Sequence, residues 1–285
     1  MISAKPELLP DTKGMATFMV VPAWQGSGSS RAMRLIDGAD AIRGDLPSSA
    51  TVLVDVPVEA GESLESGVDR LSSLLIIRER QLAALRAATA PVITIGGGCA
   101  VALAAIEYAA ADGDVCVLWI DAHPDLNDAE SSPSGSFDGM VLRSLIGEGI
   151  PQLASTAPVD PAKVVILGAR AFDDAEQDVI DEHNIRMLSV DDWTPASVIE
   201  AVAASGASKV FIHIDLDVLD PADIAGTAWA EPFGLPAAHL VELIGTVRGS
   251  FELAGAGICG FAPPSPERAV DDLPTILRII GALAR

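Results

Sequence analysis

Basic residues are scarce in this 285-residue chain, which has 18 Lys and Arg against 40 Asp and Glu and a formal net charge of −22. Nucleic acids and anionic membrane surfaces attract proteins through a basic footprint, so this deficit argues against either as a partner. No run of about 18 uninterrupted apolar residues occurs either. The sequence therefore predicts no membrane span.

Cysteine is also scarce, with only Cys99, Cys116 and Cys259 in the chain. An odd number with irregular spacing is not a disulfide framework and is typical of a reduced, cytoplasmic protein. Cys116 and Cys259 lie inside apolar runs and are expected in the core. Residues 1–15 contain no continuous apolar segment, so the sequence predicts no signal peptide.

Apolar residues, in contrast, make up 49% of the chain, which is enough for a large core. Short apolar runs rich in β-branched residues alternate with longer segments of helical spacing, a pattern typical of a parallel sheet covered on both sides. We expect one α/β domain over residues 1–285, with loops at 26–31 and 127–136. The expected strands are 16–22, 51–56, 91–95, 115–120, 164–167, 186–190, 209–215 and 256–261. The expected helices are 64–88, 100–111, 138–146, 174–183, 195–204, 236–248 and 273–283.

Acidic residues follow two of these strands. The run 115–120 ends in D-A-H-P-D, which begins at Asp121, and the run 209–214 ends in D-L-D-V-L-D-P, which begins at Asp215. Ligands bind beyond the carboxyl ends of strands in such sheets. Buried carboxylates repel one another unless a cation neutralises them, and aspartates with one imidazole suit Mn²⁺ or a similar divalent ion. A lone Asp would more simply cap a helix, but two such motifs favour a two-metal hydrolytic site.

At these motifs the chain resembles the ureohydrolase family, which includes arginase, agmatinase and formimidoylglutamase. Asp121, His123 and Asp125 match the family's DAHxD motif, and Asp215 and Asp217 match its SxDxDxxDP motif, with the Ser replaced by His213. The resemblance implies a three-layer α/β/α fold with a mostly parallel eight-stranded sheet and two Mn²⁺ ions. It implies that Asp121 and Asp215 bridge both ions, that Asp125 completes the first site and that His123 and Asp217 complete the second.

The family's GGDHS motif is altered here to Gly96-Gly97-Gly98-Cys99-Ala100. Cys99 stands where the family has a metal-ligating His, and Gly98 where it has Asp. Three interpretations stay open for Cys99: a thiolate ligand, which is soft and poorly matched to Mn²⁺; a thiol that leaves the first metal short of a ligand; or a small buried residue. His213, on the strand that leads to Asp215, is expected in the core or supporting the site.

Two further positions depart from the family. Asp138 replaces a His that relays a proton or contacts the substrate; a carboxylate performs this relay at neutral pH only if burial raises its pKa, and it could equally bind a cationic group. Gly260 stands where arginase-like sequences hold the guanidinium with a Glu, which predicts extra room there. Glu231 and Glu267 are other acids that could approach the pocket. Trp24 is expected either at its rim or in the core.

The substrate-recognition positions are kept, with arginase-like spacing from Asp121 to Asp138. The resemblance places Asn127, Ser132 and Ser134 at the α-carboxylate of an amino-acid substrate, and Asp173 and Glu176 at its α-amino group. The structural alternatives are an ordinary polar loop and, for Asp173, a helix N-cap.

We therefore predict a metal-dependent hydrolase that cleaves a guanidino or amidino C–N bond of an arginine-like amino acid. Asp125 and Asp138 are its predicted catalytic side chains. The altered positions favour an N-hydroxylated or otherwise modified arginine, because a branch of the family with Cys at that position acts on such a compound. A non-catalytic family member with an incomplete metal site is the alternative. The family also implies a homo-oligomer, a trimer or a hexamer.

Overall fold

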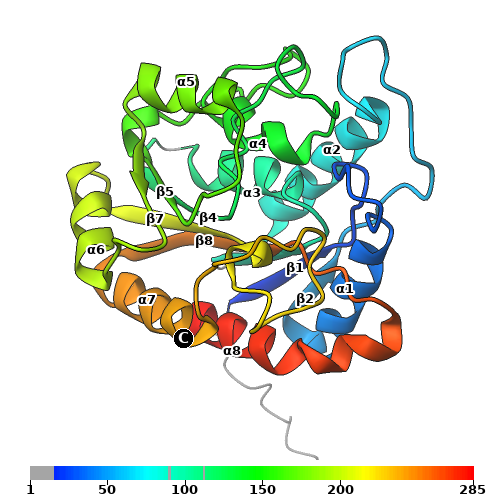
Figure 1. Cartoon of the computed structure of the whole chain (residues 1–285). Helices are drawn as coiled ribbons and strands as arrows, with labels where there is room; N and C mark the ends of the chain where they lie inside the picture. The colour runs from blue at the N-terminus through cyan, green and yellow to red at the C-terminus, as the bar shows by residue number, and fades with distance from the viewer. Residues whose placement is uncertain (1–15, 89–90, 112) are drawn as a thin grey trace, which may run out of the picture.

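Eight strands form one sheet in the computed structural model, which describes residues 16–88, 91–111 and 113–285 (Figure 1). Residues 1–15, where no signal peptide is expected, lie outside this range. All the strand pairs are parallel, and the order is β2-β1-β3-β8-β7-β4-β5-β6. The strands are β1 (Thr17–Val21), β2 (Thr51–Leu53), β3 (Val92–Gly96), β4 (Val115–Ile120), β5 (Val164–Leu167), β6 (Arg186–Leu188), β7 (Lys209–Asp215) and β8 (Glu252–Cys259).

Helices cover both faces of this sheet, as Figure 1 shows, so the predicted three-layer α/β/α architecture is confirmed. One face packs against α1 (Arg34–Gly44), α6 (Pro195–Ala204), α7 (Ala237–Ser250) and α8 (Leu273–Ala284). The other packs against α2 (Leu71–Ala87), α3 (Val101–Ala109), α4 (Val141–Leu145) and α5 (Asp174–His183). Burial on both faces explains why the central strands β3 and β4 are apolar at nearly every position.

The sequence missed α1, although Leu35, Ala39 and Ile42 have helical spacing and are all buried. The structure also moves the start of α2 from the expected residue 64 to Leu71. Leu64 and Arg70 both have positive φ angles, near 53° and 56°, which an α-helix does not accommodate.

Two strands differ from their expected bounds by three residues or more. The edge strand β2 ends at Leu53 instead of residue 56, because only one neighbour pairs with it. Strand β8 begins at Glu252, four residues before the expected start, and its segment Glu-Leu-Ala-Gly has little of the β-branched character that predicts a strand. Among the described residues, no helix has both the length and the apolar character that a membrane span requires.

The strand order places the acidic motifs side by side. Strands β7 and β4 are neighbours, with Ile214 paired to Ile120, so the next residues, Asp215 and Asp121, leave the sheet at the same edge. Strand β8 lies on the other side of β7, and its last residue, Cys259, pairs with Asp215. The turn after β3 reaches this edge as well, because β3 pairs with β8. Four strand ends therefore converge on one point.

Gly97 lies in the turn after β3 and allows this turn to pack closely against the segment that follows β1. A Cβ atom at Gly97 would lie 1.6 Å from the carbonyl oxygen of Ala23, so Gly97→Ala must displace backbone. We expect it to lower the free energy of unfolding by about 1–3 kcal/mol, measured by urea denaturation. The control is Gly245→Ala on the exposed side of α7, where nothing lies within 4 Å of the added methyl; it should be neutral or stabilising by up to about 1 kcal/mol. Equal effects of the two substitutions would contradict this account of Gly97.

Candidate metal centre

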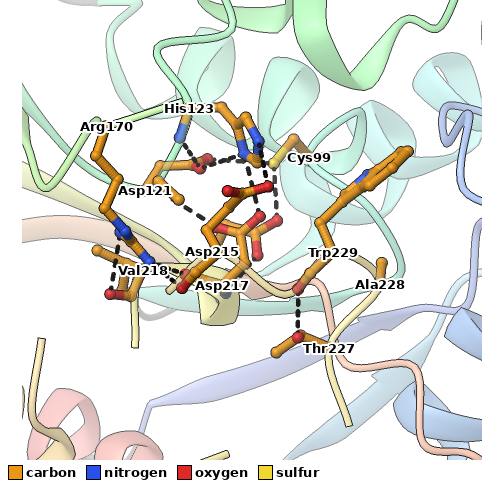
Figure 2. Close-up of polar contacts among 12 residues, drawn as sticks. Cys99, Asp121, His123, Arg170, Asp215, Asp217, Val218, Thr227, Ala228 and Trp229 are labelled. Atoms are coloured by element: carbon orange, nitrogen blue, oxygen red, sulfur yellow. Dashed lines mark hydrogen bonds and ion pairs between the residues drawn. The ribbon is translucent and has the colours of Figure 1, made fainter. Parts of the chain in front are cut away.

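The carboxyl groups of Asp121 and Asp215 both contact the same sulfur atom. The Sγ atom of Cys99 lies 3.5 Å from Oδ2 of Asp121 and 3.2 Å from Oδ2 of Asp215 (Figure 2). All three side chains are buried. The turn after β3, the end of β4 and the end of β7 thus bring together one thiol and two carboxyl groups, as the motifs predict.

His123 forms a second group with Asp121 and Asp217. Its Nδ1 atom lies 3.1 Å from Oδ2 of Asp217 and 3.6 Å from Oδ1 of Asp121. The two oxygens of Asp121 therefore face different donor groups, His123 on one side and Cys99 on the other. This is the arrangement that a carboxylate shared between two ions requires.

Asp125 completes the predicted ligand set at the same cavity. Its backbone has a φ of 53°, a conformation that Asp tolerates better than most residues. Its side chain is buried, and its Oδ2 atom has no hydrogen-bond partner within the part of the chain described. A buried carboxylate oxygen without a partner is costly, so this atom is suited to a ligand that the protein binds.

Asp138 reaches the cluster through space that two glycines leave open. A Cβ atom at Gly98 would lie 2.0 Å from Oδ2 of Asp138, and one at Gly26 would lie 2.3 Å from its Oδ1. The same Oδ1 accepts a hydrogen bond from the backbone N–H of Ala100 at 2.8 Å. The carboxyl group that the sequence lacks at Gly98 is thus supplied at this place by Asp138.

Burial and mutual repulsion set the charge of the cluster. Burial and the nearby carboxylates raise the pKa of Asp215 to about 7 and that of Asp217 to about 6. Burial also raises the pKa of Asp138 to about 7 and that of the Cys99 thiol well above its ordinary value. Burial opposes the charge of His123, but hydrogen bonds to Asp121 and Asp217 outweigh it and raise its pKa to about 12.

One imidazolium thus faces several buried acids. The donor set of carboxylate oxygens and one imidazole fits divalent cations, which would favour the charged form of these acids.

The cluster lies in a cavity of about 440 Å³, of which Cys99, Asp121, His123, Asp125, Asp138, Asp215 and Asp217 are lining residues. Two of the predicted substrate contacts, Ser134 and Asp173, line it too. Trp229 and Glu231 also line it, and Oε1 of Glu231 lies 3.8 Å from Nε2 of His123. The sequence offered no signal for Trp229, whereas Glu231 was one of two acids expected near the pocket.

Three predicted substrate contacts, Asn127, Ser132 and Glu176, are not among the cavity-lining residues. Glu176 accepts hydrogen bonds from the backbone N–H groups of Leu126 and Asp173, both at 3.0 Å. It forms a capping box with Asp173 at the start of α5, so the N-cap expected of Asp173 is present as well.

Asn127 and Ser132, the other two predicted contacts, form hydrogen bonds that hold the loop 127–136, called the recognition loop below. The Nδ2 atom of Asn127 donates to Oδ2 of Asp173 at 3.1 Å, and the Oγ atom of Ser131 donates to Oδ1 of Asn127 at 2.8 Å. Ser132 Oγ accepts the backbone N–H of Gly135. These contacts fix the loop around the two residues that do face the cavity, Ser134 and Asp173.

Gly260 lines the cavity, but the position that its side chain would take is occupied. Gly260 has a φ of 85°, and a Cβ atom on it would lie 2.1 Å from Oδ1 of Asp215. The carboxyl group of Asp215 fills the space that a side chain would need. Trp24 does not line the cavity either: the guanidinium of Arg70 lies over its ring, 5.0 Å from the centroid.

Two residues expected in the core also reach the cluster. Cys259 is buried, but its Sγ atom lies 3.5 Å from Sγ of Cys99 and 3.4 Å from Oδ2 of Asp215. The Nε2 atom of His213 lies 3.7 Å from Sγ of Cys99 and 3.6 Å from Oδ2 of Asp121. The sequence marked His213, which stands at the Ser position of the second motif, as a residue that could support the site, whereas no motif marks Cys259, whose contacts depend on which strands are neighbours.

Comparison with known proteins gives one consistent result. A model of the arginase family matches residues 30–272. An arginase from Staphylococcus aureus (strain MRSA252) is 28% identical over 198 residues, which are 65% of this chain and 64% of that protein. The match spans between 48% and 64% of the length of the curated arginases compared.

Two further matches extend over nearly the whole chain. An N(omega)-hydroxy-L-arginine amidinohydrolase from Streptomyces lavendulae is 27% identical over 268 residues, 91% of each protein. The crystal structure of Entamoeba histolytica arginase, solved with L-ornithine, superposes with a TM-score of 0.85 over 95% of this chain and 98% of that one. At 22% identity, this last likeness shows a shared fold.

The raised pKa of Asp138 has a measurable consequence for the metal-free protein. Its pKa is 3.8 in the unfolded reference and about 7 in the fold, so the folded state binds an extra proton between these values. The free energy of unfolding must therefore fall as the pH rises from about 4 to about 7. In EDTA, Asp138→Asn should reduce this loss by at least about 1 kcal/mol, measured by urea denaturation at pH 5 and pH 8.

The control is Asp45→Asn, which changes an exposed carboxyl after α1. It should leave the pH dependence as it is in the unmodified chain. A slope that Asp138→Asn does not change would show that this carboxyl group titrates alike in the folded and unfolded protein.

Proposed function

This chain belongs to the arginase family, and from that premise we propose that it is a metal-dependent hydrolase. It would cleave a guanidino or amidino C–N bond of an arginine-like amino acid. The observation that carries the proposal is the cluster of buried acids, four of them aspartates of the two motifs, in a cavity of about 440 Å³. A cavity of this size suits a small molecule.

The proposed ligands are divided between two divalent ions, with Mn²⁺ expected from the predominance of oxygen donors. Asp121 and Asp215 would be shared, Cys99 and Asp125 would belong to one ion, and His123 and Asp217 to the other. The contacts of the two oxygens of Asp121 with different groups support this division. When bound, such ions lower the pKa of a water molecule and polarise the carbon it attacks.

Proton transfer is the part that we assign to the protein. Asp125 lies at the cavity with a buried, unpartnered Oδ2 atom, as far as the described chain extends, and burial raises its pKa. In this proposal Oδ2 accepts a proton from the attacking water and delivers it to the leaving nitrogen. Asp138, whose pKa of about 7 is matched to neutral pH, is a second relay on the side of Gly98.

Asp173 is the proposed partner of the substrate's α-ammonium group. It is exposed at the cavity, and Asn127 holds its carboxyl group in place through a 3.1 Å hydrogen bond. The hydroxyl of Ser134 would donate to the α-carboxylate, with Asn127, Ser132 and Glu176 holding the loop. The relative from Streptomyces lavendulae supports an N-hydroxylated arginine as the substrate.

We further propose a cytoplasmic protein that assembles as a homo-oligomer, a trimer or a hexamer. The few, unpaired cysteines support a reducing compartment. The resemblance to ureohydrolases supports the assembly.

Metal content tests the core of the proposal. The purified chain should bind two divalent ions and release urea or hydroxyurea from arginine or N-hydroxyarginine. Asp121→Asn removes the shared carboxylate and should lower both metal retention and turnover by at least about 100-fold, measured by elemental analysis and urea assay. The matched control is Asp178→Asn on the exposed side of α5. A chain that holds at most one ion and turns over no amidine would instead be a non-catalytic member of the family.

Substrate recognition is tested at Asp173. Loss of one charged partner costs about 1.5–3 kcal/mol, so Asp173→Asn should raise KM for N-hydroxyarginine about tenfold or more. Agmatine, which lacks the α-carboxylate, should bind more weakly than the amino acids to the unmodified chain. Asp174→Asn changes the neighbouring exposed carboxyl, which does not line the cavity, and serves as the control. If agmatine competes as well as arginine, or if Asp173→Asn changes nothing, the recognition argument is wrong.

A further inference from the structure

Two cysteines and a histidine form a compact donor group on the inner side of the acidic cluster. The Sγ atoms of Cys99 and Cys259 are 3.5 Å apart, and Nε2 of His213 lies 3.7 Å from the first and 3.9 Å from the second. All three side chains are at most 4% exposed. Cys99 also belongs to the group with Asp121 and Asp215, whereas Cys259 and His213 belong to neither of the groups that contain the motif aspartates.

We propose that Cys99, Cys259 and His213 bind a borderline-soft divalent ion of the Zn²⁺ type. Cys259 and His213 are then metal ligands in addition to the motif aspartates and His123. This proposal rests on the proposed function, which assigns metal ions to the cluster. It assigns the inner position to a different class of ion from the outer position.

The distances fit a tetrahedral ion. Around an ion with bonds of about 2.3 Å to sulfur and about 2.0 Å to nitrogen or oxygen, the donor atoms lie roughly 3.3–3.8 Å apart. The Cys99–Cys259 and Cys99–His213 separations of 3.5 and 3.7 Å lie within that range, and the 3.9 Å between Cys259 and His213 is slightly above it.

The two carboxylates are equally well placed. Asp215 Oδ2 lies 3.2 Å from Sγ of Cys99 and 3.4 Å from Sγ of Cys259. Asp121 Oδ2 lies 3.5 Å from Sγ of Cys99 and 3.6 Å from Nε2 of His213. Each oxygen therefore lies near two of the three donors, and the group whose donor atoms all lie within 4.8 Å of one another is Cys99, Cys259 and His213.

The imidazole of His213 is held for this role. Its ring stacks on Trp119, with centroids 3.6 Å apart and planes 18° from parallel, and the two residues are paired across β4 and β7. Its Nδ1 atom faces Gly257 of β8 and has no hydrogen-bond partner in the described part of the chain. Nε2 is therefore the nitrogen that contacts the cluster.

The chemistry of the donors selects the ion. Thiolate and imidazole ligands suit Zn²⁺ and other borderline-soft ions, whereas the remaining oxygen donors suit Mn²⁺. Each thiol that binds must release its proton to solvent, so binding should strengthen as the pH rises. The inner and outer positions of the centre thus differ in the ion they prefer.

Cobalt is the probe that reports sulfur ligation directly. Co²⁺ occupies Zn²⁺ sites, and a thiolate ligand gives it a near-ultraviolet charge-transfer band that oxygen and nitrogen ligands do not give. The full-length chain, freed of metal under a thiol reductant, is titrated with Co²⁺ and then with Zn²⁺. We expect a charge-transfer band that saturates at one equivalent of Co²⁺ and is removed by Zn²⁺ but not by an equal amount of Mn²⁺.

Matched variants assign the band to its ligands. Cys99→Ala and Cys259→Ala should each reduce it by about half and weaken Zn²⁺ affinity at least about tenfold. His213→Gln should weaken affinity similarly while keeping both sulfurs, and far-ultraviolet circular dichroism verifies that each variant is folded. Cys116→Ala is the control, because Cys116 is also buried but is not part of any of the donor groups found in the described structure.

The outcomes separate this proposal from the proposed function. Two bound ions and amidine turnover without a charge-transfer band would overturn the inference and leave the function intact. The converse result, a cysteine-dependent band without turnover, would support the inference and count against the function. The inference would also be overturned if Cys116→Ala reduced the charge-transfer band as much as Cys259→Ala does. The presence or absence of the charge-transfer band is measured on the unmodified chain, so the test of sulfur ligation does not depend on whether a variant folds.

Discussion

The cost of burying several carboxyl groups at one point governs the rest of this structure. Asp121, Asp125, Asp215 and Asp217 are all at most 7% exposed, and His123 is the one cation in their ligand groups among the residues described. Two apolar strands, β4 and β7, carry three of these acids, so the packing of the sheet forces them together. The hydrophobic layers on both faces offset the repulsion, and divalent ions would remove most of it. Without a bound cation such a cluster costs stability, which supports the proposed metal centre.

Glycine makes that cluster sterically possible. The carboxyl group of Asp138 lies where side chains at Gly98 and Gly26 would be, and the carboxyl group of Asp215 lies where a side chain at Gly260 would be. The departures from the family motifs are therefore coupled in space. The acid missing at Gly98 is replaced in space by Asp138, and Gly260, at the position of a family substrate contact, leaves room for Asp215, a proposed metal ligand. The number of altered motif positions therefore overstates how much the set of acidic groups at this centre has changed.

The centre has two chemically different sides. The cavity side carries oxygen donors, His123 and the recognition loop, which the hydrogen bonds of Asn127 and Glu176 hold together. The inner side carries sulfur and the stacked imidazole of His213. In the proposed function, this division would let the inner side hold one ion while the other ion faces the substrate. A soft ligand at Cys99 would then be compatible with an active site.

Much of this could be predicted from the sequence, because it depends on local order along the chain. Runs buried on both faces predict a parallel sheet, the acidic motifs predict metal ligands, and the capping residues Asp173 and Glu176 mark the start of α5. Only the tertiary structure decided which donors join them. Cys259 contacts Cys99 across 160 residues of sequence, and His213 contacts it across 114, because β3, β8 and β7 are consecutive strands at the centre of the sheet. No local pattern encodes strand order, so core residues became candidate ligands only once the strands were placed side by side.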